Sequence, residues 1–158
     1  MRGSIVSIHI ASVEGGELQP LDSAELVAGC GIRGDRHFSA DGSRADEALT
    51  LIESEQVELF NELTGLSLAP HDTRRQIVTH GIPLNDLVGV RFSIGDVDVE
   101  GVELCEPCAY LADHLTKQFS ITGVAPPDIV RGLAHRAGIR ARILNDGVVR
   151  VGDPVTSG

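Results

Sequence analysis

The chain has 158 residues, enough to bury one core, so the simplest expectation is a single domain over residues 1–158. Its formal net charge of −10 argues against nucleic acid or an anionic membrane as a partner, because both attract basic surfaces. No apolar run is long enough to cross a bilayer, and the first residues lead directly into strand-like alternation. We therefore expect no membrane partner and a cytoplasmic location.

The basic residues and the cysteines narrow the function further. Twelve of the 13 basic residues are arginine, and the remaining one is Lys117. Arginine offers a planar, permanently charged fork to phosphate or carboxylate, whereas lysine forms Schiff bases. The composition favours an anionic small molecule held in a pocket, and no covalent pyridoxal phosphate is expected on this chain. Three cysteines, an odd number, suit a reducing compartment better than a disulfide framework.

The first part of the chain predicts short strands and one helix. Alternating apolar residues predict a strand over residues 4–13, in which His9 is expected at the strand surface. Further strands are predicted over residues 24–28 and 48–52, and a helix over residues 54–64. The apolar residues of this helix are expected to form its buried stripe: Val57, Leu59, Phe60 and Leu63.

A glycine-rich turn precedes a polar cluster. Residues 29–34 contain three glycines, which indicate a tight bend or a close approach of the backbone to another group. The turn ends in Asp35, Arg36 and His37. These three residues form either an ordinary loop surface or an edge that faces a ligand.

Residues 72–81 look like a strand in which Arg74 and Arg75 point to opposite faces. One of the two must then face inward or lie at a sheet edge. A buried arginine is costly without a partner, so an internal carboxylate or a bound anion is implied.

Two hairpins are predicted in the second half of the chain. The first joins an alternating strand over residues 90–94 to the strand that leads to Cys105, with a turn at Gly95. The second joins residues 139–144 to residues 148–151 through an Asn-Asp-Gly turn. Many short strands with few helices predict a closed or nearly closed β-barrel.

Cys105 and Cys108 lie where a strand ends and a helix is predicted to begin; this helix ends near Phe119, and residues 120–130 are predicted as a loop. Unpaired amide N–H groups and the helix dipole favour a thiolate at Cys108. A thiolate is both a nucleophile and a metal ligand, so the pair indicates sulfur chemistry or soft-metal binding. The structural alternative is two inert thiols, and one Cys-x-x-Cys supplies too few ligands for a closed zinc site.

Five segments in this order resemble the MOSC domain, named for the C-terminal domain of molybdenum cofactor sulfurases. They are residues 31–37, 73–79, 87–92, 105–108 and 151–153. The resemblance spans nearly the whole chain. It implies a mainly β fold, a MOSC-type β-barrel with a few peripheral α-helices, and an interior cleft for an anionic pterin or a sulfur-bearing ligand.

The resemblance also implies roles for particular residues. Cys108 would carry a persulfide or ligate molybdenum, with Cys105 as an assisting or resolving thiol. Arg74 or Arg75 would neutralise the anionic molybdenum cofactor (molybdopterin) through bidentate hydrogen bonds. The family often has Asn at the position of Gln76, whose longer amide makes a direct ligand contact an open question.

Asp35 and His37 are further cofactor-binding candidates, whereas Cys30 falls outside the family pattern and is expected to be a packed loop residue. Three functions remain open: cofactor binding with sulfur transfer, molybdenum-dependent reduction of N-hydroxylated compounds, and a non-catalytic zinc or dithiol module that adds His37 or His114. The first two would need a partner protein, either a pyridoxal-phosphate-dependent cysteine desulfurase or an electron donor.

Overall fold

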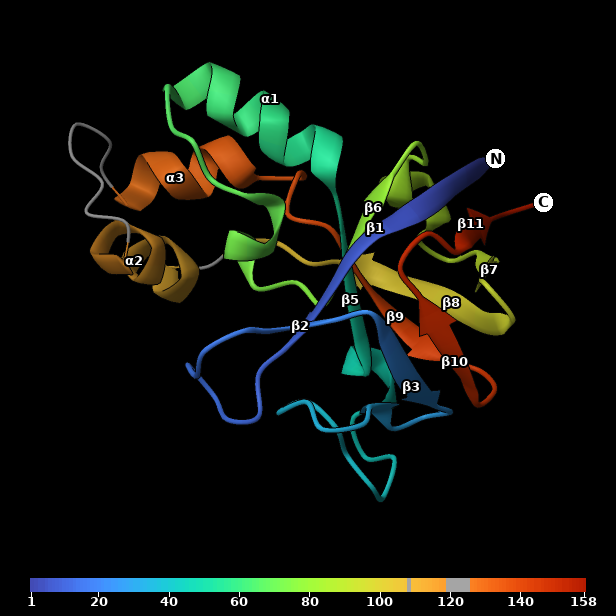
Figure 1. Cartoon of the computed structure of the whole chain (residues 1–158). Coiled ribbons are helices and arrows are strands. Elements are labelled where there is room, and N and C mark those ends of the chain that lie inside the picture. Colours follow the sequence, from blue (N-terminus) through green and yellow to red (C-terminus); the bar gives the residue numbers. More distant parts are fainter. Residues whose placement is uncertain (108, 119–125) are drawn as a thin grey trace.

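The computed structural model describes residues 1–107, 109–118 and 126–158, and it is mainly β (Figure 1). The strands, in chain order, are β1 Arg2–Ile10, β2 Gln19–Leu21, β3 Ser23–Val27, β4 Gly31–Ile32, β5 Leu49–Glu53, β6 Ile77–His80, β7 Arg91–Ile94, β8 Val97–Leu104, β9 Ile139–Ile143, β10 Gly147–Arg150 and β11 Pro154–Thr156. The α-helices are α1 Ser54–Thr64, α2 Ala109–Gln118 and α3 Pro126–Leu133, and the 3-10 helices are η1 Ala45–Glu47, η2 Pro70–Thr73 and η3 Leu84–Leu87.

Seven of the strands close into a barrel, as the sequence predicts. Their order is β11-β7-β8-β9-β5-β6-β1, and pairing of β1 with β11 closes the ring. All neighbours are antiparallel except β5 and β6. Strand β2 pairs with β1 outside the ring, and β3, β4 and β10 form a separate three-stranded sheet.

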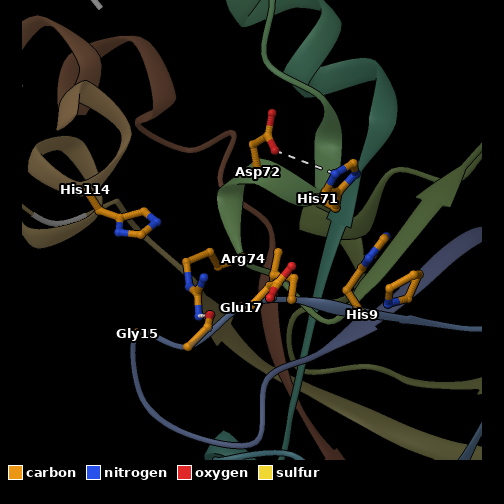
Figure 2. Close-up of a pocket in the computed structure, with 10 residues that line it drawn as sticks. His9, Gly15, Glu17, His71, Asp72, Arg74 and His114 are labelled. Atoms are coloured by element: carbon orange, nitrogen blue, oxygen red, sulfur yellow. Dashed lines mark hydrogen bonds and ion pairs between the residues drawn. The ribbon is translucent and has the colours of Figure 1, made fainter. Parts of the chain in front are cut away.

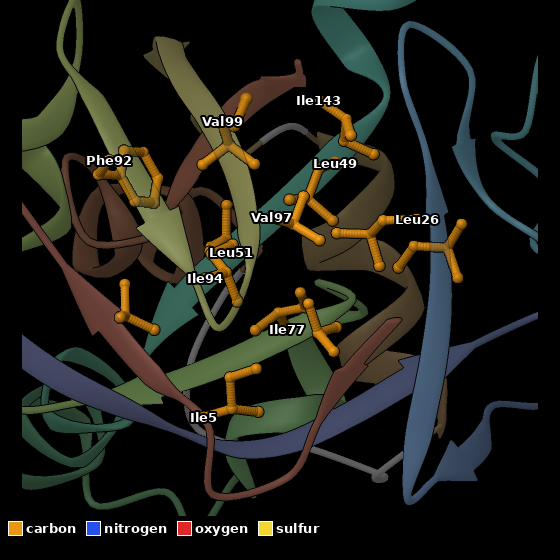
Figure 3. Close-up of a cluster of buried hydrophobic side chains, with 14 of the residues drawn as sticks. Ile5, Leu26, Leu49, Leu51, Ile77, Phe92, Ile94, Val97, Val99 and Ile143 are labelled. Carbon is orange, nitrogen blue, oxygen red and sulfur yellow. The ribbon is translucent and has the colours of Figure 1, made fainter. Parts of the chain in front are cut away.

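Aliphatic side chains from the barrel strands fill the interior, where they form one hydrophobic cluster (Figure 3). Strand β9 shows the alternation that produces this arrangement. Ile139, Ala141 and Ile143 are buried, whereas Arg140 and Arg142 between them are partly exposed. Because successive side chains on a strand point to opposite faces, a run of alternating residues supplies both the core and a charged outer face.

The three helices lie together on one side of the barrel, at the left in Figure 1. A second hydrophobic cluster joins them to each other and to the sheet, and Phe60 of α1, Leu115 of α2 and Ile129 of α3 are fully buried in it. None of the helices in the described ranges is long and apolar enough to span a membrane.

The buried stripe of α1 differs from the prediction. Val57 and Phe60 are buried, but Leu59 is 38% and Leu63 is 62% exposed. The inward face continues from Phe60 to Asn61, whose amide forms two hydrogen bonds with the backbone of Leu68. At 3.6 residues per turn, a buried helix face that contains Val57, Phe60 and Asn61 leaves Leu59 and Leu63 on the solvent side.

The predicted loop over residues 120–130 is wrong from its seventh residue onward, because α3 begins at Pro126. Proline is tolerated in the first turn of a helix, where its missing N–H would have no partner. Residues 119–125 lie outside the described part of the chain. The helix predicted after Cys108 is confirmed as α2.

The predicted strand over residues 72–81 is wrong in its first half. The 3-10 helix η2 occupies Pro70–Thr73, and its first turn is capped by the Asp72 carboxylate, which accepts the Ala69 N–H at 2.8 Å. Arg74 then adopts a left-handed conformation with φ 66°, and pairing as β6 starts only at Ile77. Arg74 and Arg75 are therefore not alternating strand residues.

The second predicted hairpin has the right strands but the wrong partners. Strand β9 pairs with β5 and β8, whereas β10 pairs with β3 in the other sheet. The turn side chains bind other segments: Asn145 accepts the N–H of Asp98 at 2.6 Å, and Asp146 accepts that of Ala28 at 2.8 Å. These bonds direct the two strands into different sheets. The first hairpin, β7 with β8, is confirmed.

Candidate functional site

Two adjoining pockets lie between the barrel and the helices, and Arg74 borders both. The smaller one, here called the arginine pocket, has a volume of about 250 Å³. Its wall includes five arginines and two glutamates: Arg36, Arg44, Arg74, Arg75, Arg140, Glu14 and Glu47. This is a local surplus of three formal positive charges on a chain with a net charge of −10. Such a concave surface attracts anions.

Arg36 has a nearly buried guanidinium, with its side chain only 8% exposed. It donates from Nη1 to the Asp35 carboxylate at 3.2 Å, and its Nε lies 3.6 Å from the Glu14 carboxylate, beyond hydrogen-bond reach. Nε is buried and has no hydrogen-bond partner among the described residues. A buried donor left unpaired costs about 1–3 kcal/mol, so an acceptor bound here would be favourable.

Arg74 joins the two pockets. It ends η2 in the left-handed conformation, which costs a non-glycine residue roughly 1–3 kcal/mol and is most often found at functional sites. Its Nη2 donates to the carbonyl oxygen of Gly16 at 2.8 Å, which fixes the β1–β2 loop against the end of η2. The strained backbone therefore places a guanidinium at the boundary between the pockets.

Arg75 mainly holds backbone in place. Its guanidinium donates to three carbonyl oxygens, those of Ala137 at 2.9 Å, Cys105 at 3.1 Å and Thr73 at 3.2 Å. Three of its five N–H donors are thus committed to protein. The side chain borders the arginine pocket, but its main effect is to hold Cys105 against the neighbouring segments.

Asp35 and Gln76 form a buried hydrogen-bond centre behind the pocket wall. The Asp35 carboxylate accepts N–H groups of Ala11 at 3.1 Å and His37 at 3.0 Å, the Arg36 guanidinium, and the Gln76 amide at 2.6 Å. The Gln76 carbonyl oxygen accepts the N–H of Thr50 at 2.9 Å. Both residues are at most 5% exposed, so they position Arg36 and His37, and neither lines the pocket.

His37 and Cys105 both line the arginine pocket. Burial, followed by the nearby Arg36 charge, lowers the pKa of His37, so its imidazole is neutral at neutral pH. Cys105 is 4% exposed, and its backbone N–H donates to the carbonyl oxygen of Gly138 at 2.8 Å. Arg140 lies close enough to interact electrostatically with its thiol. This small cavity therefore brings a thiol together with permanent positive charge.

The other two cysteines of the chain are Cys30 and Cys108. Cys108, the predicted catalytic thiol and metal ligand, lies outside the described residues. Cys30 is partly buried in its loop, where its thiol donates weakly to the carbonyl oxygen of Ala40 at 3.8 Å, which agrees with the expected packing role. Within the described ranges, no group of three or more His, Cys, Asp or Glu side chains could hold a metal ion.

The larger pocket, here called the histidine pocket, has a volume of about 660 Å³ (Figure 2). The residues that give it its chemical character are His9, Glu17, His71, Asp72, Arg74 and His114. Apart from Arg74, and His114 as a possible zinc ligand, the sequence does not single these residues out as site residues. Strand alternation does place His9 on the face opposite Ile8, but it does not show that η2 covers that face.

His9 is buried, which corrects its predicted place at the strand surface. It is 7% exposed, and its ring stacks on that of His71 with centroids 4.6 Å apart. Burial, followed by the nearby His71, lowers the pKa of His9, while Asp72 opposes this shift. Its Nε2 is buried and has no hydrogen-bond partner in the described part of the chain. The pocket therefore has a flat, neutral imidazole in its wall.

Comparison with known families finds that residues 33–156 match the model of the MOSC domain. A search of curated proteins finds no match.

Several solved structures share the fold. The YuaD protein of Bacillus subtilis superposes with a TM-score of 0.86 at 18% identity, over 98% of this chain and 94% of its own. YiiM of Geobacillus stearothermophilus gives 0.69 at 19% identity, over 98% and 74% of the two chains. YiiM of Escherichia coli gives 0.70 at 19% identity, over 100% and 71%. At this identity the likeness establishes the architecture.

Proposed function

Since the chain belongs to the MOSC domain family, we propose that it binds the molybdenum cofactor, or carries sulfur on a reactive cysteine for maturation of a metal–sulfur cofactor. The observation that supports this proposal is the arginine pocket, above all the buried Arg36, whose Nε has no hydrogen-bond partner in the described part of the chain. An anion there would supply the missing acceptor and offset the positive charge around Cys105.

The residues of this pocket fit an anionic, sulfur-bearing cofactor. Arg36, Arg44 and Arg140 would hold its phosphate or oxyanionic end through charge-assisted hydrogen bonds. The Cys105 thiol is a soft ligand of the kind that suits a metal–sulfur centre, and the family resemblance assigns the same role to Cys108. When bound, the molybdenum cofactor supplies a redox-active metal that exchanges oxygen and sulfur ligands.

The sulfur-carrier role requires one balanced step on the protein. A cysteine thiolate of the chain attacks the outer sulfur of a donor persulfide, the donor's S–S bond breaks, and the donor leaves as a thiolate. The product is a persulfide on the receiving cysteine. The guanidinium of Arg140 beside Cys105 would stabilise the negative charge of both thiolate and persulfide. A pyridoxal-phosphate-dependent cysteine desulfurase is the class of partner that supplies such a donor.

The test measures cofactor on purified protein from cells with abundant molybdenum cofactor. Molybdenum is determined by elemental analysis and pterin by the fluorescence of its released oxidation product. We expect both in wild type and a loss of at least tenfold in Arg36→Gln and Arg44→Gln. The matched control is Arg91→Gln, because Arg91 is 77% exposed and lies outside both pockets.

The sulfur-carrier arm incubates the same proteins with a cysteine desulfurase and cysteine, and detects persulfide by mass spectrometry after alkylation. Cys105→Ser and Cys108→Ser show which thiol receives the sulfur. Wild-type protein that contains neither molybdenum nor pterin, and that acquires no persulfide, would contradict the proposal.

A further inference from the structure

The loop between β1 and β2, residues 11–18, borders both pockets. Its Glu14 is part of the wall of the arginine pocket, and residues 15–18 are part of the wall of the histidine pocket. Pairing of Ile10 with Gln19 closes the loop at its base. A displacement of this one loop would therefore change the walls of both pockets at once.

The tip of this loop is held lightly. Gly15 has φ 69°, a conformation that favours glycine, and a Cβ added at Gly16 would lie 2.9 Å from the Val13 carbonyl oxygen. The Glu14 side chain is 71% exposed and Val13 is 61% exposed, so the tip buries little surface. Arg74 ties the tip to η2 through its 2.8 Å hydrogen bond to the Gly16 carbonyl oxygen (Figure 2). A loop with two glycines and little buried surface opens readily.

Glu14 faces the cation that we propose as the anchor for an anion. Its carboxylate lies 3.6 Å from Nε of Arg36, too far for a hydrogen bond, and this Nε has no hydrogen-bond partner among the described residues. Glu14 therefore offsets the charge of Arg36 without satisfying its donor. Because the carboxylate is largely exposed, the ion pair stabilises this arrangement by a factor of no more than about five.

We propose that Glu14 is an internal competitor for the anion site of the arginine pocket, an inference that rests on the proposed function. The Glu14 carboxylate and a bound anion occupy the approach to Arg36 alternately, because two negative charges beside one guanidinium repel each other. An oxyanion that reaches Nε forms a charge-assisted hydrogen bond that Glu14 does not make, so it expels the carboxylate. The β1–β2 loop moves with Glu14, and the wall of the histidine pocket moves with the loop.

The first test measures the binding of inorganic phosphate by calorimetry. Glu14→Gln removes the competing charge and keeps the size of the side chain, so we expect it to raise phosphate affinity about threefold to fivefold. The matched control is Glu17→Gln. Glu17 is an exposed carboxylate of the same loop that borders the histidine pocket and not the arginine pocket, so its loss should change the affinity by less than about 1.5-fold.

A second background separates competition for Arg36 from a general effect of negative charge. In Arg36→Gln protein the group for which Glu14 competes is gone, so adding Glu14→Gln should leave phosphate affinity within about 1.5-fold. A gain that persists at full size in this background would show that Glu14 acts only through the overall charge of the pocket, and would overturn the proposal.

The movement of the loop is tested by hydrogen–deuterium exchange of residues 11–18 with mass spectrometry. Phosphate should raise the exchange rate of this segment in wild type, because the expelled loop loses its contacts. In Glu14→Gln the rate should be raised already, and phosphate should add little. Slower exchange with phosphate would mean that the loop closes over the anion, and an unchanged rate would mean that it stays in place. Either result would overturn the proposal.

The outcomes also distinguish this proposal from the anion site on which it rests. Phosphate binding that Arg36→Gln weakens and Glu14→Gln leaves unchanged or weakens would overturn the competitor and leave the anion site standing. Binding that appears only in Glu14→Gln would support the competitor. Absence of binding in both wild type and Glu14→Gln would overturn both.

Discussion

Replacing Asp35 with Asn tests whether the buried hydrogen-bond centre holds the arginine pocket together. The carboxylate accepts from four donors, and its bonds to the Ala11 N–H and the Gln76 amide are fully buried. In asparagine an NH₂ group replaces one of the two acceptor oxygens, so at least one of the four donors would face another donor and lose its acceptor. Each buried donor left unpaired costs about 1–3 kcal/mol, and the charge that pairs with Arg36 is also lost. We expect Asp35→Asn to lower the free energy of unfolding by about 2–4 kcal/mol.

The measurement is urea unfolding of the two single variants and the double variant Asp35→Asn with Gln76→Glu. The double change exchanges donor and acceptor across the 2.6 Å bond, so it should recover about 1–2 kcal/mol relative to the sum of the single changes. Glu25→Gln is the control, because the Glu25–Arg33 pair is more than half exposed and should matter by under about 0.5 kcal/mol. A cost of Asp35→Asn no larger than that of the control, or single effects that simply add, would refute the reasoning.

Three further predictions concern other parts of the fold. Burial above all raises the pKa of Glu53 from 4.5 to about 7. The contribution of Glu53 to the free energy of unfolding is therefore fully present below pH 4.5 and is lost as the pH rises through 7. In urea unfolding, Glu53→Gln should match wild type near pH 4.5 and be more stable than wild type at about pH 8. Gly138 has φ 90°, and an added Cβ would clash with the backbone carbonyl oxygen of Leu51. Gly138→Ala should therefore lower the free energy of unfolding by at least about 2 kcal/mol more than Gly29→Ala, where φ is 70° and the space around an added Cβ is open. Equal losses of stability in thermal unfolding would contradict this prediction. Arg75→Met removes three hydrogen bonds to carbonyl oxygens. In a Cys108→Ser background, it should raise the alkylation rate of the Cys105 thiol about tenfold, because the segment that carries Cys105 is then held less firmly. An unchanged rate would show that Arg75 does not position Cys105.

Local sequence patterns predict much of the strand content of this fold. Alternation correctly indicates β7, β8, β9 and β10, because each of these strands buries one face. It does not determine partners. The Asn-Asp-Gly turn after β9 is typical of a hairpin, yet Asn145 and Asp146 bind backbone more than 40 residues away and send β10 to another sheet. Such long-range bonds leave no local signal in the sequence.

The candidate site is predictable to a similar extent. The motifs place Arg74, Arg75, His37 and Cys105 at one cavity, and the structure brings these four together. The histidine pocket could not be foreseen in the same way, because it depends on η2 folding over the far face of β1. Only that tertiary contact turns His9 from an expected surface residue into a buried one.

Motif position alone does not tell which arginine is available to a ligand. Arg75 is part of the family-like motif, but three of its donors bind the carbonyl oxygens that fix Cys105. Arg36 lies outside the adjacent arginine pair, and its Nε is a buried donor without a hydrogen-bond partner among the described residues. Because a buried donor without an acceptor gains more from an anion than a satisfied donor does, we propose that Arg36 anchors the anion and that Arg75 positions Cys105. Arg36→Gln should therefore weaken phosphate binding more than Arg75→Met does, although Arg75 is the arginine that the motif emphasises.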